Sequence, residues 1–457
     1  MNSAAPTIKS SLEQETEKGV SPQPLQEAVD AEPDVDEPPD GGLQAWMTVA
    51  ASFLASFMAF GAGNVWGVYQ DAYMSDTSSR FSNVTSLFKI GFVGGTATGF
   101  GFAVGPFGNV LVSRFGIRAP VLLGVLMMSV ALQLASIATT YWELLLSQGI
   151  MFGIGSSLAY IPAIGLPSQW FNKRRGLATG IASSGSGVGA VVLAPIVQAA
   201  IDGLGIPWAL RIVGFLCFCF GMLALGLLRQ RTNAHKRVQY KLFDLTVLRT
   251  PTYPFYLAFA FLQFFGFIVP IFYIPGYCTA LGISGTNSSA VLSVTAVVNS
   301  IGRIIAGRLA DQAGVVNVLI VFNFLSGVMC LAVWLVAEDI GVMMGFAVLW
   351  GLFSGAYWAL AVPASAKIIG MERLGSAVAI QYLMNVIPPI FASPIGARFP
   401  LWLVQLISAA ALQSGVSEES REAYRYLIVF SALTSVVASL LLVPVRLRYS
   451  RQLIAKV

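Results

Sequence analysis

The chain contains twelve apolar segments that are each long enough to cross a lipid bilayer as an α-helix. One crossing needs about 20 mostly apolar residues. Because the bilayer core offers no water to backbone N–H and C=O groups, such segments fold as helices. The sequence therefore predicts an all-α membrane protein. The predicted spans cover residues 44–69, 86–111, 119–139, 142–165, 176–200, 208–228, 252–275, 289–310, 315–336, 340–363, 374–401 and 425–445.

Composition excludes a water-soluble enzyme of this size. Of the 457 residues, 56% are hydrophobic and 11% are charged, whereas soluble domains carry about 25% charged residues. The single histidine, His235, cannot form a histidine cluster, and the four cysteines show no metal-ligand spacing. No span contains paired carboxylates or a nucleophile motif. We therefore predict no enzymatic activity, no metal and no cofactor.

Polar segments divide the chain into five parts. Residues 1–40 hold ten acidic and two basic residues among several prolines, and this composition predicts a disordered tail. Six spans follow, then a basic linker, and then six more spans. The predicted parts are an acidic cytosolic tail (1–40), an N-terminal six-helix half (41–228), a cytosolic linker (229–251), a C-terminal six-helix half (252–446) and a short basic tail (447–457).

The distribution of Lys and Arg predicts the orientation, since these residues collect on the cytosolic side of membrane proteins. With the N-terminus inside, 19 of those beyond residue 40 lie on the cytosolic side or in the inner part of the eighth span, and six lie on the other side. Both termini are therefore predicted to be cytosolic. The sequons at Asn83 and Asn287 then face outward as candidate glycosylation sites. Because the basic residues lie beside spans, the pI near 9.0 does not indicate a nucleic-acid partner.

The loop after the eighth span resembles a signature of the major facilitator superfamily. It reads GRLADQAG over residues 307–314, close to the pattern GxLaDrxG. Gly307 would allow a close helix approach, Asp311 lies at a helix end, and Gly314 permits a tight turn. The corresponding loop after the second span has Ser113 where the acid would be. Two six-span halves joined by a hydrophilic linker are also the organisation of this superfamily.

Two further motifs resemble the monocarboxylate porter family within that superfamily. The segment DGGLQAW opens the first span, and WFNKRRGLATG opens the fifth. The acidic tail and the wording of the first motif resemble the fungal branch of the family. The resemblance implies a twelve-helix fold that transports a small organic solute by alternating access. The residues that carry it are Asp40, Gly41, Gly42, Trp46, Phe171, Lys173, Arg174, Arg175 and Gly180.

An arginine within the eighth span is the leading candidate for solute recognition. Arg303 lies more than one helical turn inside the end of this span, where burying a charge is costly unless it has a function. A guanidinium that faces the cavity can donate paired hydrogen bonds to a carboxylate or to another group of oxygens. The alternative is an anchor whose side chain reaches back to the inner interface.

Beside this arginine the sequence departs from the animal monocarboxylate carriers. The resemblance implies an aspartate one turn earlier and a lysine late in the first span, and this chain has Asn299 and Asn64 there. Neither amide titrates, so the proton relay of those carriers is missing. We therefore favour efflux of a larger amphipathic or carboxylate-bearing metabolite over proton-linked monocarboxylate transport. A non-transporting sensor is less favoured, because the linker is short.

Aromatic and amide side chains of the cavity-lining spans complete the candidate site, since rings with polar tips offer wide contact and few fixed charges. The predicted partners are an organic solute, the lipid bilayer and, in the alternative mechanism, a co-transported proton. No protein partner is predicted. The plasma membrane is the predicted location, with the vacuolar membrane as the alternative. The candidate lining residues are Tyr69, Tyr160, Gln263, Tyr273, Tyr357, Trp358, Gln381 and Asn385.

Overall fold

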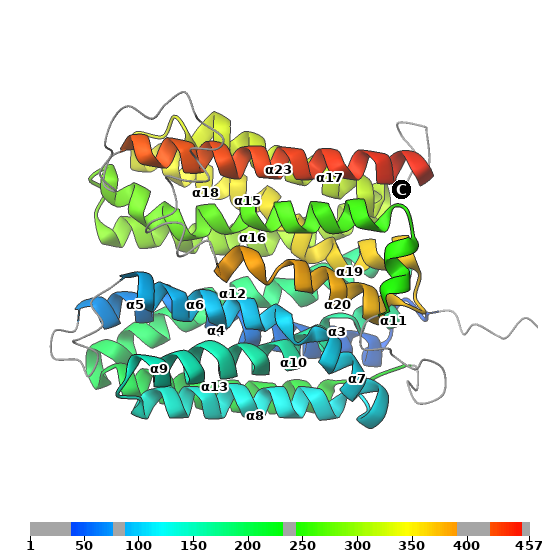
Figure 1. Cartoon of the computed structure of the whole chain (residues 1–457), viewed down its shortest axis with the longest axis horizontal. Helices are drawn as coiled ribbons and strands as arrows, with labels where there is room; N and C mark the ends of the chain where they lie inside the picture. Colours follow the sequence, from blue (N-terminus) through cyan, green and yellow to red (C-terminus); the bar gives the residue numbers. More distant parts are fainter. Residues whose placement is uncertain (1–37, 76–86, 232–243, 391–420, 450–457) are drawn as a thin grey trace, which may run out of the picture. The chain divides into compact units, whose positions relative to one another are not determined.

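A computed structural model of the protein describes residues 38–75, 87–231, 244–390 and 421–449. Every regular element in these ranges is a helix (Figure 1). The described residues from Asp40 onward form one compact unit. The predictions for the acidic tail up to residue 37, for Asn83 and for residues 450–457 lie outside the described residues.

The N-terminal half consists of six helical spans. The first span begins after Gly42, whose φ of 92° is a conformation that glycine adopts without steric cost. The second span is bent by 43° between its two helices. In chain order the spans are α3 (Leu43–Ser56) with η1 (Phe57–Gly61), α4 (Ala62–Asn64) and α5 (Trp66–Ser75); α6 (Leu87–Ala103) with α7 (Gly105–Phe115); α8 (Arg118–Ile137); α9 (Tyr141–Leu144) with η2 (Leu145–Met151), α10 (Phe152–Ile164) and α11 (Pro167–Trp170); α12 (Arg175–Leu204); and α13 (Ile206–Leu227).

The C-terminal half repeats this plan after the short helix η3 (Leu245–Arg249). The second span of this half, which is the eighth of the chain, ends at Gly314. The φ of 95° at Gly314 makes the turn that the loop motif predicts. The helices are α15 (Tyr253–Ala280), α16 (Gly285–Ala313), α17 (Val315–Met329) with η4 (Cys330–Trp334), α18 (Ile340–Ser354) with α19 (Ala356–Ile369), α20 (Leu374–Met384) and α23 (Arg421–Tyr449).

The all-α membrane fold predicted from the sequence is confirmed. Among the described residues, ten helices are long and apolar enough to cross a membrane, or eleven when the bent pair α6 and α7 counts as one span. The predicted span 374–401 is present as α20 and an apolar helix that continues to Ile390, and its remainder lies outside the described residues. The fourth and tenth spans extend beyond their predicted ends at residues 165 and 363, to Trp170 and Ile369. The prediction followed the apolar stretch, whereas the helices continue past it.

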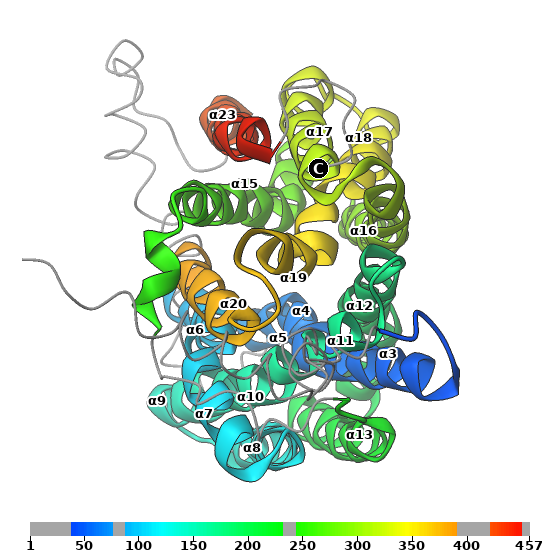
Figure 2. The same cartoon turned by 90° about the vertical axis from the view of Figure 1, so that its right-hand side faces the viewer.

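The two halves meet along two seams, which are visible when the helices are viewed end-on (Figure 2). The first seam joins α12 to α16 and α19, and the second joins α6 and α7 to α20. Glycines bring the backbones together in the first seam: a Cβ atom at Gly176 would lie 2.4 Å from the carbonyl oxygen of Gly307. A Cβ atom at Gly180 would lie 2.6 Å from the carbonyl oxygen of Arg303. Small residues permit such approaches between membrane helices.

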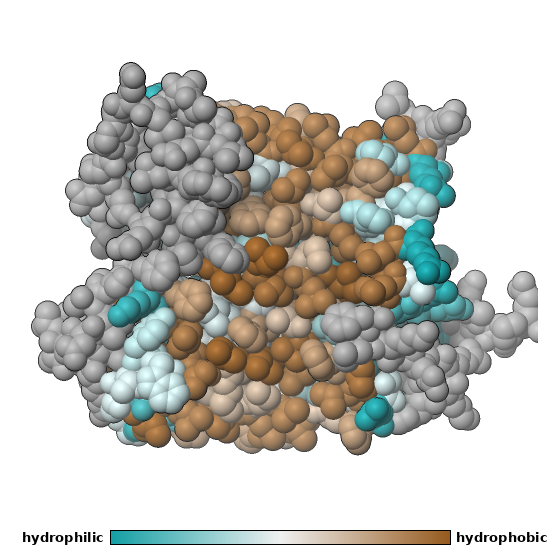
Figure 3. Space-filling model, in the orientation of Figure 1, coloured by the Kyte–Doolittle hydropathy of each residue, from teal (hydrophilic) through white to brown (hydrophobic). Residues whose placement is uncertain are grey.

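The outer surface is apolar across the middle of the helices. Figure 3 shows hydrophobic side chains over the centre of one face and hydrophilic ones toward its ends. Large apolar side chains point outward, including Phe215 and Leu440, which are 60% and 56% exposed. In water each would forgo roughly 1.5–3 kcal/mol of burial free energy, whereas lipid removes that cost. The surface therefore fits the predicted bilayer partner.

Candidate functional site

Two of the sequence motifs are in direct contact at the end of the bundle where α12 begins, which we call the inner end. The Asp40 carboxylate accepts hydrogen bonds from the backbone N–H groups of Asn172 and Lys173, at 2.6 and 2.7 Å. The rings of Trp46 and Phe171 meet edge to face, with centroids 5.0 Å apart. The motifs that open the first and fifth spans therefore form one joint, which holds the start of α3 against the loop before α12.

A second joint links the two halves at the inner end. The Asp311 carboxylate accepts hydrogen bonds from the backbone N–H groups of Gly176 and Leu177, at 2.7 and 2.9 Å. These N–H groups belong to the first turn of α12, so they have no partner within the helix and mark the positive end of its dipole. The joint therefore combines two charge-assisted hydrogen bonds with the close backbone contact of Gly176 and Gly307.

The corresponding position in the N-terminal half lacks this link. Ser113 donates to the carbonyl of Val110 within its own helix, at 2.8 Å. Its neighbour Asn109 donates across the second seam to the carbonyl of Gly375, at 2.7 Å. At the inner end, an acid therefore holds the first seam, and a neutral amide bonds across the second.

Replacing Asp311 with alanine is expected to weaken closure of the inner end. A hydrogen bond to a charged group contributes about 1.5–3 kcal/mol, and about 1.4 kcal/mol changes an equilibrium tenfold. The distance between spin labels at the exposed positions Arg118 and Met371, one in each half, should therefore shift toward longer values. Ser113→Ala is the matched control, because it removes only a bond within one helix. An unchanged distance distribution in Asp311→Ala would contradict this role.

Arg303 lies buried in the first seam, with 6% of its side chain exposed. Its Nε donates to Asn299 Oδ1 at 3.0 Å, one turn earlier on the same helix. Its Nη1 donates across the seam to the Ser183 carbonyl at 2.5 Å and to Ser186 Oγ at 2.6 Å. These acceptors are all neutral. Within the described residues no carboxylate bonds to Arg303, and its Nη2 makes no hydrogen bond. A side chain enclosed between the halves does not fit an anchor that reaches the interface.

An aromatic cluster lies beside this arginine and contains rings from both halves. Its centre is Trp358, whose ring centroid lies 6.0 Å from the guanidinium carbon of Arg303, within the range of a cation–π interaction. The hydroxyls of Tyr160 and Tyr382 lie 3.5 Å apart across the boundary between the halves. The cluster consists of Trp358, Phe60, Phe102, Tyr160, Phe264, Phe267, Tyr357 and Tyr382.

A polar network holds one side of the aromatic cluster in place. The Tyr357 hydroxyl lies within 3.1 Å of both amide atoms of Asn385. Gln381 donates to the same hydroxyl at 3.3 Å and accepts from Ser365 at 2.7 Å. These predicted lining residues are therefore bonded to one another between α19 and α20. The network holds the Tyr357 hydroxyl, and the Tyr357 ring packs against Trp358 at a centroid distance of 5.1 Å.

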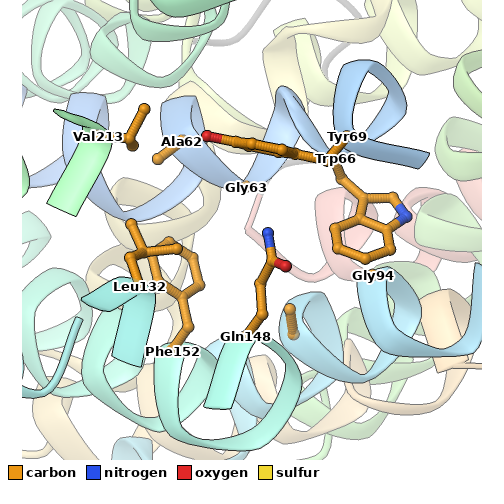
Figure 4. A pocket seen from close by; sticks show the side chains of 10 residues that line it. Ala62, Gly63, Trp66, Tyr69, Gly94, Leu132, Gln148, Phe152 and Val213 are labelled. Atoms are coloured by element: carbon orange, nitrogen blue, oxygen red, sulfur yellow. The ribbon is translucent and has the colours of Figure 1, made fainter. Parts of the chain in front are cut away.

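Three predicted site residues, Tyr69, Tyr273 and Asn64, lie apart from Arg303. Tyr69 and Gln148 point into a small pocket inside the N-terminal half (Figure 4). Tyr273 packs against Tyr424 of α23, at a centroid distance of 6.5 Å. Asn64 is exposed. The π-helical turn η1 explains the displacement of Tyr69, because the wider turn rotates all later residues of the span relative to a regular helix.

Sequence reasoning identified Tyr160 of the N-terminal half but missed four other residues that this half contributes to the site. Ser183 and Ser186 bond to Arg303, and Phe60 and Phe102 pack on Trp358. The serines carried a usable signal, since they lie three residues apart among the glycines of α12, on a face that the sequence marks for close packing. Phe60 and Phe102 carried none, because aromatic residues are frequent throughout the spans. Of the candidate sequons, Asn287 is exposed in the first turn of α16.

Comparison with known proteins decides the family. A sequence profile described as "Major Facilitator Superfamily" matches residues 49–337 and 257–456. The chain belongs to the major facilitator superfamily. The predicted superfamily and the predicted transport function are therefore confirmed, and this major facilitator protein is a membrane transporter. The narrower assignment to the monocarboxylate porter family stays a prediction.

Several fungal relatives of this major facilitator transporter cover most of its length. "MFS-type transporter opdF" of Penicillium oxalicum is 30% identical over 414 residues, which are 90% of this chain and 92% of the relative. "Fujikurins efflux protein" of Gibberella fujikuroi is 33% identical over 380 residues, 81% of this chain and 79% of the relative. "Probable transporter MCH2" of Saccharomyces cerevisiae is 29% identical over 344 residues, 74% of this chain and 72% of the relative.

Proposed function

We propose that this transporter exports an amphipathic organic acid, with Arg303 as the group that binds the acid. The observation that carries the proposal is a buried arginine at the boundary of the halves whose described partners are all neutral. An ion in a low-dielectric site is costly unless an opposite charge meets it. A carboxylate on the solute would supply that charge and could accept from the unused Nη2 group.

The aromatic cluster supports a solute with a sizeable apolar part. Trp358 and its neighbouring rings offer wide apolar contact directly beside the cation. Rings of this kind contribute most through buried area and add about 0.5–1.5 kcal/mol for each favourable pair. An acid group on Arg303 and an apolar body on the rings together describe an amphipathic molecule.

The arrangement of cross-half contacts supports alternating access. Asp311, Asn109 and Arg303 bond between the halves in the portion of their helices nearer the inner end. Arg303 and Trp358 are thereby enclosed in the described structure. Parting the halves at the inner end would break these bonds and uncover both residues. This is the motion that a transporter with a fixed site between two rocking halves requires.

Export is the proposed direction, and the names of relatives support it. Besides the fujikurins efflux protein, the relatives include "Agnestins efflux protein AgnL12" of Paecilomyces divaricatus, 30% identical over 359 residues. We propose the plasma membrane as the location. The test is metabolite profiling of cells and medium after deletion and after complementation. The expected result is an acidic metabolite that accumulates inside the deletion strain and returns to the medium on complementation. Unchanged profiles on both sides would overturn export.

Proton-linked uptake is the second candidate, and the contact of Arg303 with Asn299 argues against it. An amide cannot exchange a proton with the solute or the medium, so flux should depend only weakly on an imposed pH gradient. Flux of the profiled metabolite in vesicles, with and without the gradient, checks this expectation. Steep dependence in the unaltered protein would favour the proton-linked alternative. Asn299→Asp is the informative variant, because it would introduce a titratable group beside the arginine.

A further inference from the structure

Two buried polar atoms in facing helices of the C-terminal half have no hydrogen-bond partner. They are the indole Nε1 of Trp358 on α19 and the side-chain oxygen Oε1 of Gln263 on α15. The two side chains are 7% and 1% exposed, so both atoms are shielded from bulk water in this arrangement. Most buried polar atoms in native proteins are bonded, and each exception needs a physical explanation.

Helical spacing places Gln263 opposite Trp358. Tyr256, Phe259, Gln263 and Phe267 follow one another at intervals of three, four and four residues, which puts them on one face of α15. The other three members of this face all contact α19. Tyr256 donates to the Ala361 carbonyl at 2.8 Å, Phe259 packs on Tyr357 at 5.8 Å, and Phe267 packs on Trp358 at 5.5 Å. Gln263 therefore faces the segment of α19 that carries Trp358.

The unpaired atoms are chemically complementary, yet they do not bond to each other. Indole Nε1–H can only donate, and the amide Oε1 can only accept. A hydroxyl is the simple organic group that accepts one hydrogen bond and donates another through the same atom. A ketone or an ether could satisfy Trp358 but would leave the Gln263 oxygen unpaired.

We propose that Trp358 and Gln263 form a subsite for a hydroxyl group of the transported solute. The subsite rests on the proposed function and narrows its substrate class to hydroxylated amphipathic acids. Arg303 lies beside the same tryptophan, with its guanidinium carbon 6.0 Å from the Trp358 ring centroid. One compact molecule can thus place an acid on Arg303 and a hydroxyl on the subsite. Phe60 and Phe102 of the N-terminal half pack on Trp358, so the subsite becomes accessible when the halves part.

The test measures equilibrium binding of matched probes to the full-length protein in nanodiscs. The probes are phenylpropanoate and para-hydroxyphenylpropanoate, together with the amides of both acids. The unaltered protein is expected to prefer the hydroxylated member of each pair roughly tenfold or more, because a site built for a hydroxyl rejects analogues that lack it. Gln263→Leu and Trp358→Phe should bring both ratios close to one. Gln263→Leu should keep the thermal stability of the unaltered protein, since it removes an oxygen that has no partner.

Asn323→Leu is the matched control, because Asn323 is another fully buried amide whose oxygen lacks a partner but lies on α17. It should keep the preference for the hydroxyl. Arg303→Ala should lose the preference for acid over amide and keep the preference for the hydroxyl, which separates the subsite from the proposed acid recognition. The subsite is overturned if the unaltered protein shows no hydroxyl preference with either pair. It is equally overturned if the preference survives in both Gln263→Leu and Trp358→Phe.

Discussion

Replacing Arg303 with alanine is expected to abolish transport while the protein still reaches the membrane. Removing one partner of a buried, hydrogen-bonded charge costs about 2–5 kcal/mol of binding, which corresponds to a loss of roughly 30-fold or more. Arg303→Lys should recover little, because an ammonium keeps the charge but lacks the planar fork that reaches Asn299 and the serines of α12 together. Export of the profiled metabolite, normalised to surface abundance, measures the effect.

Arg211 provides a control that is chemically close to this change. Its guanidinium carbon lies 5.0 Å from the ring centroid of Trp208, and its Nε donates to Ser136 Oγ at 3.0 Å. Arg211→Ala thus also deletes a cation that contacts an indole and a serine, but on α13 and outside both seams. Transport should be close to normal in this variant. Full transport by Arg303→Ala would limit the arginine to a packing role in the first seam and contradict the proposed recognition of an acid.

Replacing Gly307 with valine is expected to prevent closure of the inner end. A Cβ atom at this position would lie 2.3 Å from the carbonyl oxygen of Gly176 and 2.7 Å from its carbonyl carbon. Because both are backbone atoms, no side chain can move aside, and the two helices must separate. Overpacking a tight contact costs about 1–3 kcal/mol, occasionally more, and here the cost applies only to the closed arrangement. Export should fall at least tenfold, and the label distance between Arg118 and Met371 should lengthen.

Valine at a glycine with open space around it is the control, because it carries the general cost of a β-branched residue in a helix without the clash at Gly307. Gly226 of α13 and Gly345 of α18 would meet no atom within 4 Å on gaining a Cβ. Valine at either position should leave export and the label distance unchanged. A closed inner end in Gly307→Val, reported by an unaltered distance, would show that the first seam is not limited by this contact.

Hydropathy made most of the fold predictable, because a bilayer imposes a length and a composition on each span. The motifs also marked both joints at the inner end, where Asp40 and Asp311 lie in short patterns with distinctive residue types. The partners of these acids were not predictable. Each carboxylate bonds to backbone N–H groups more than 130 positions away in sequence. Because nearly every residue type has a backbone N–H, the sequence does not mark such donors.

The side chains that pack around Arg303 were less predictable from the sequence than Arg303 itself. Arg303 stood out because an ion inside a span is rare, and Trp358 and Tyr357 were expected in the lining. Which face of each helix points at them depends on local winding, as the displacement of Tyr69 after the π-turn η1 shows. The contribution of Ser183 depends on how closely α12 approaches α16, and that distance follows from glycines on both helices.

The glycine contacts of the first seam also determine where this transporter can acquire new substrates. Along α12 and α16 the two main chains touch, so even a single added methyl group at Gly176 or Gly180 would meet carbonyl oxygen of the opposite helix. The facing surfaces of α15 and α19 meet instead through large side chains such as Phe267 and Trp358, which can be exchanged for others of similar volume. Laboratory evolution toward a different cargo should therefore accumulate its changes on α15 and α19, and libraries that vary α12 should return few folded members.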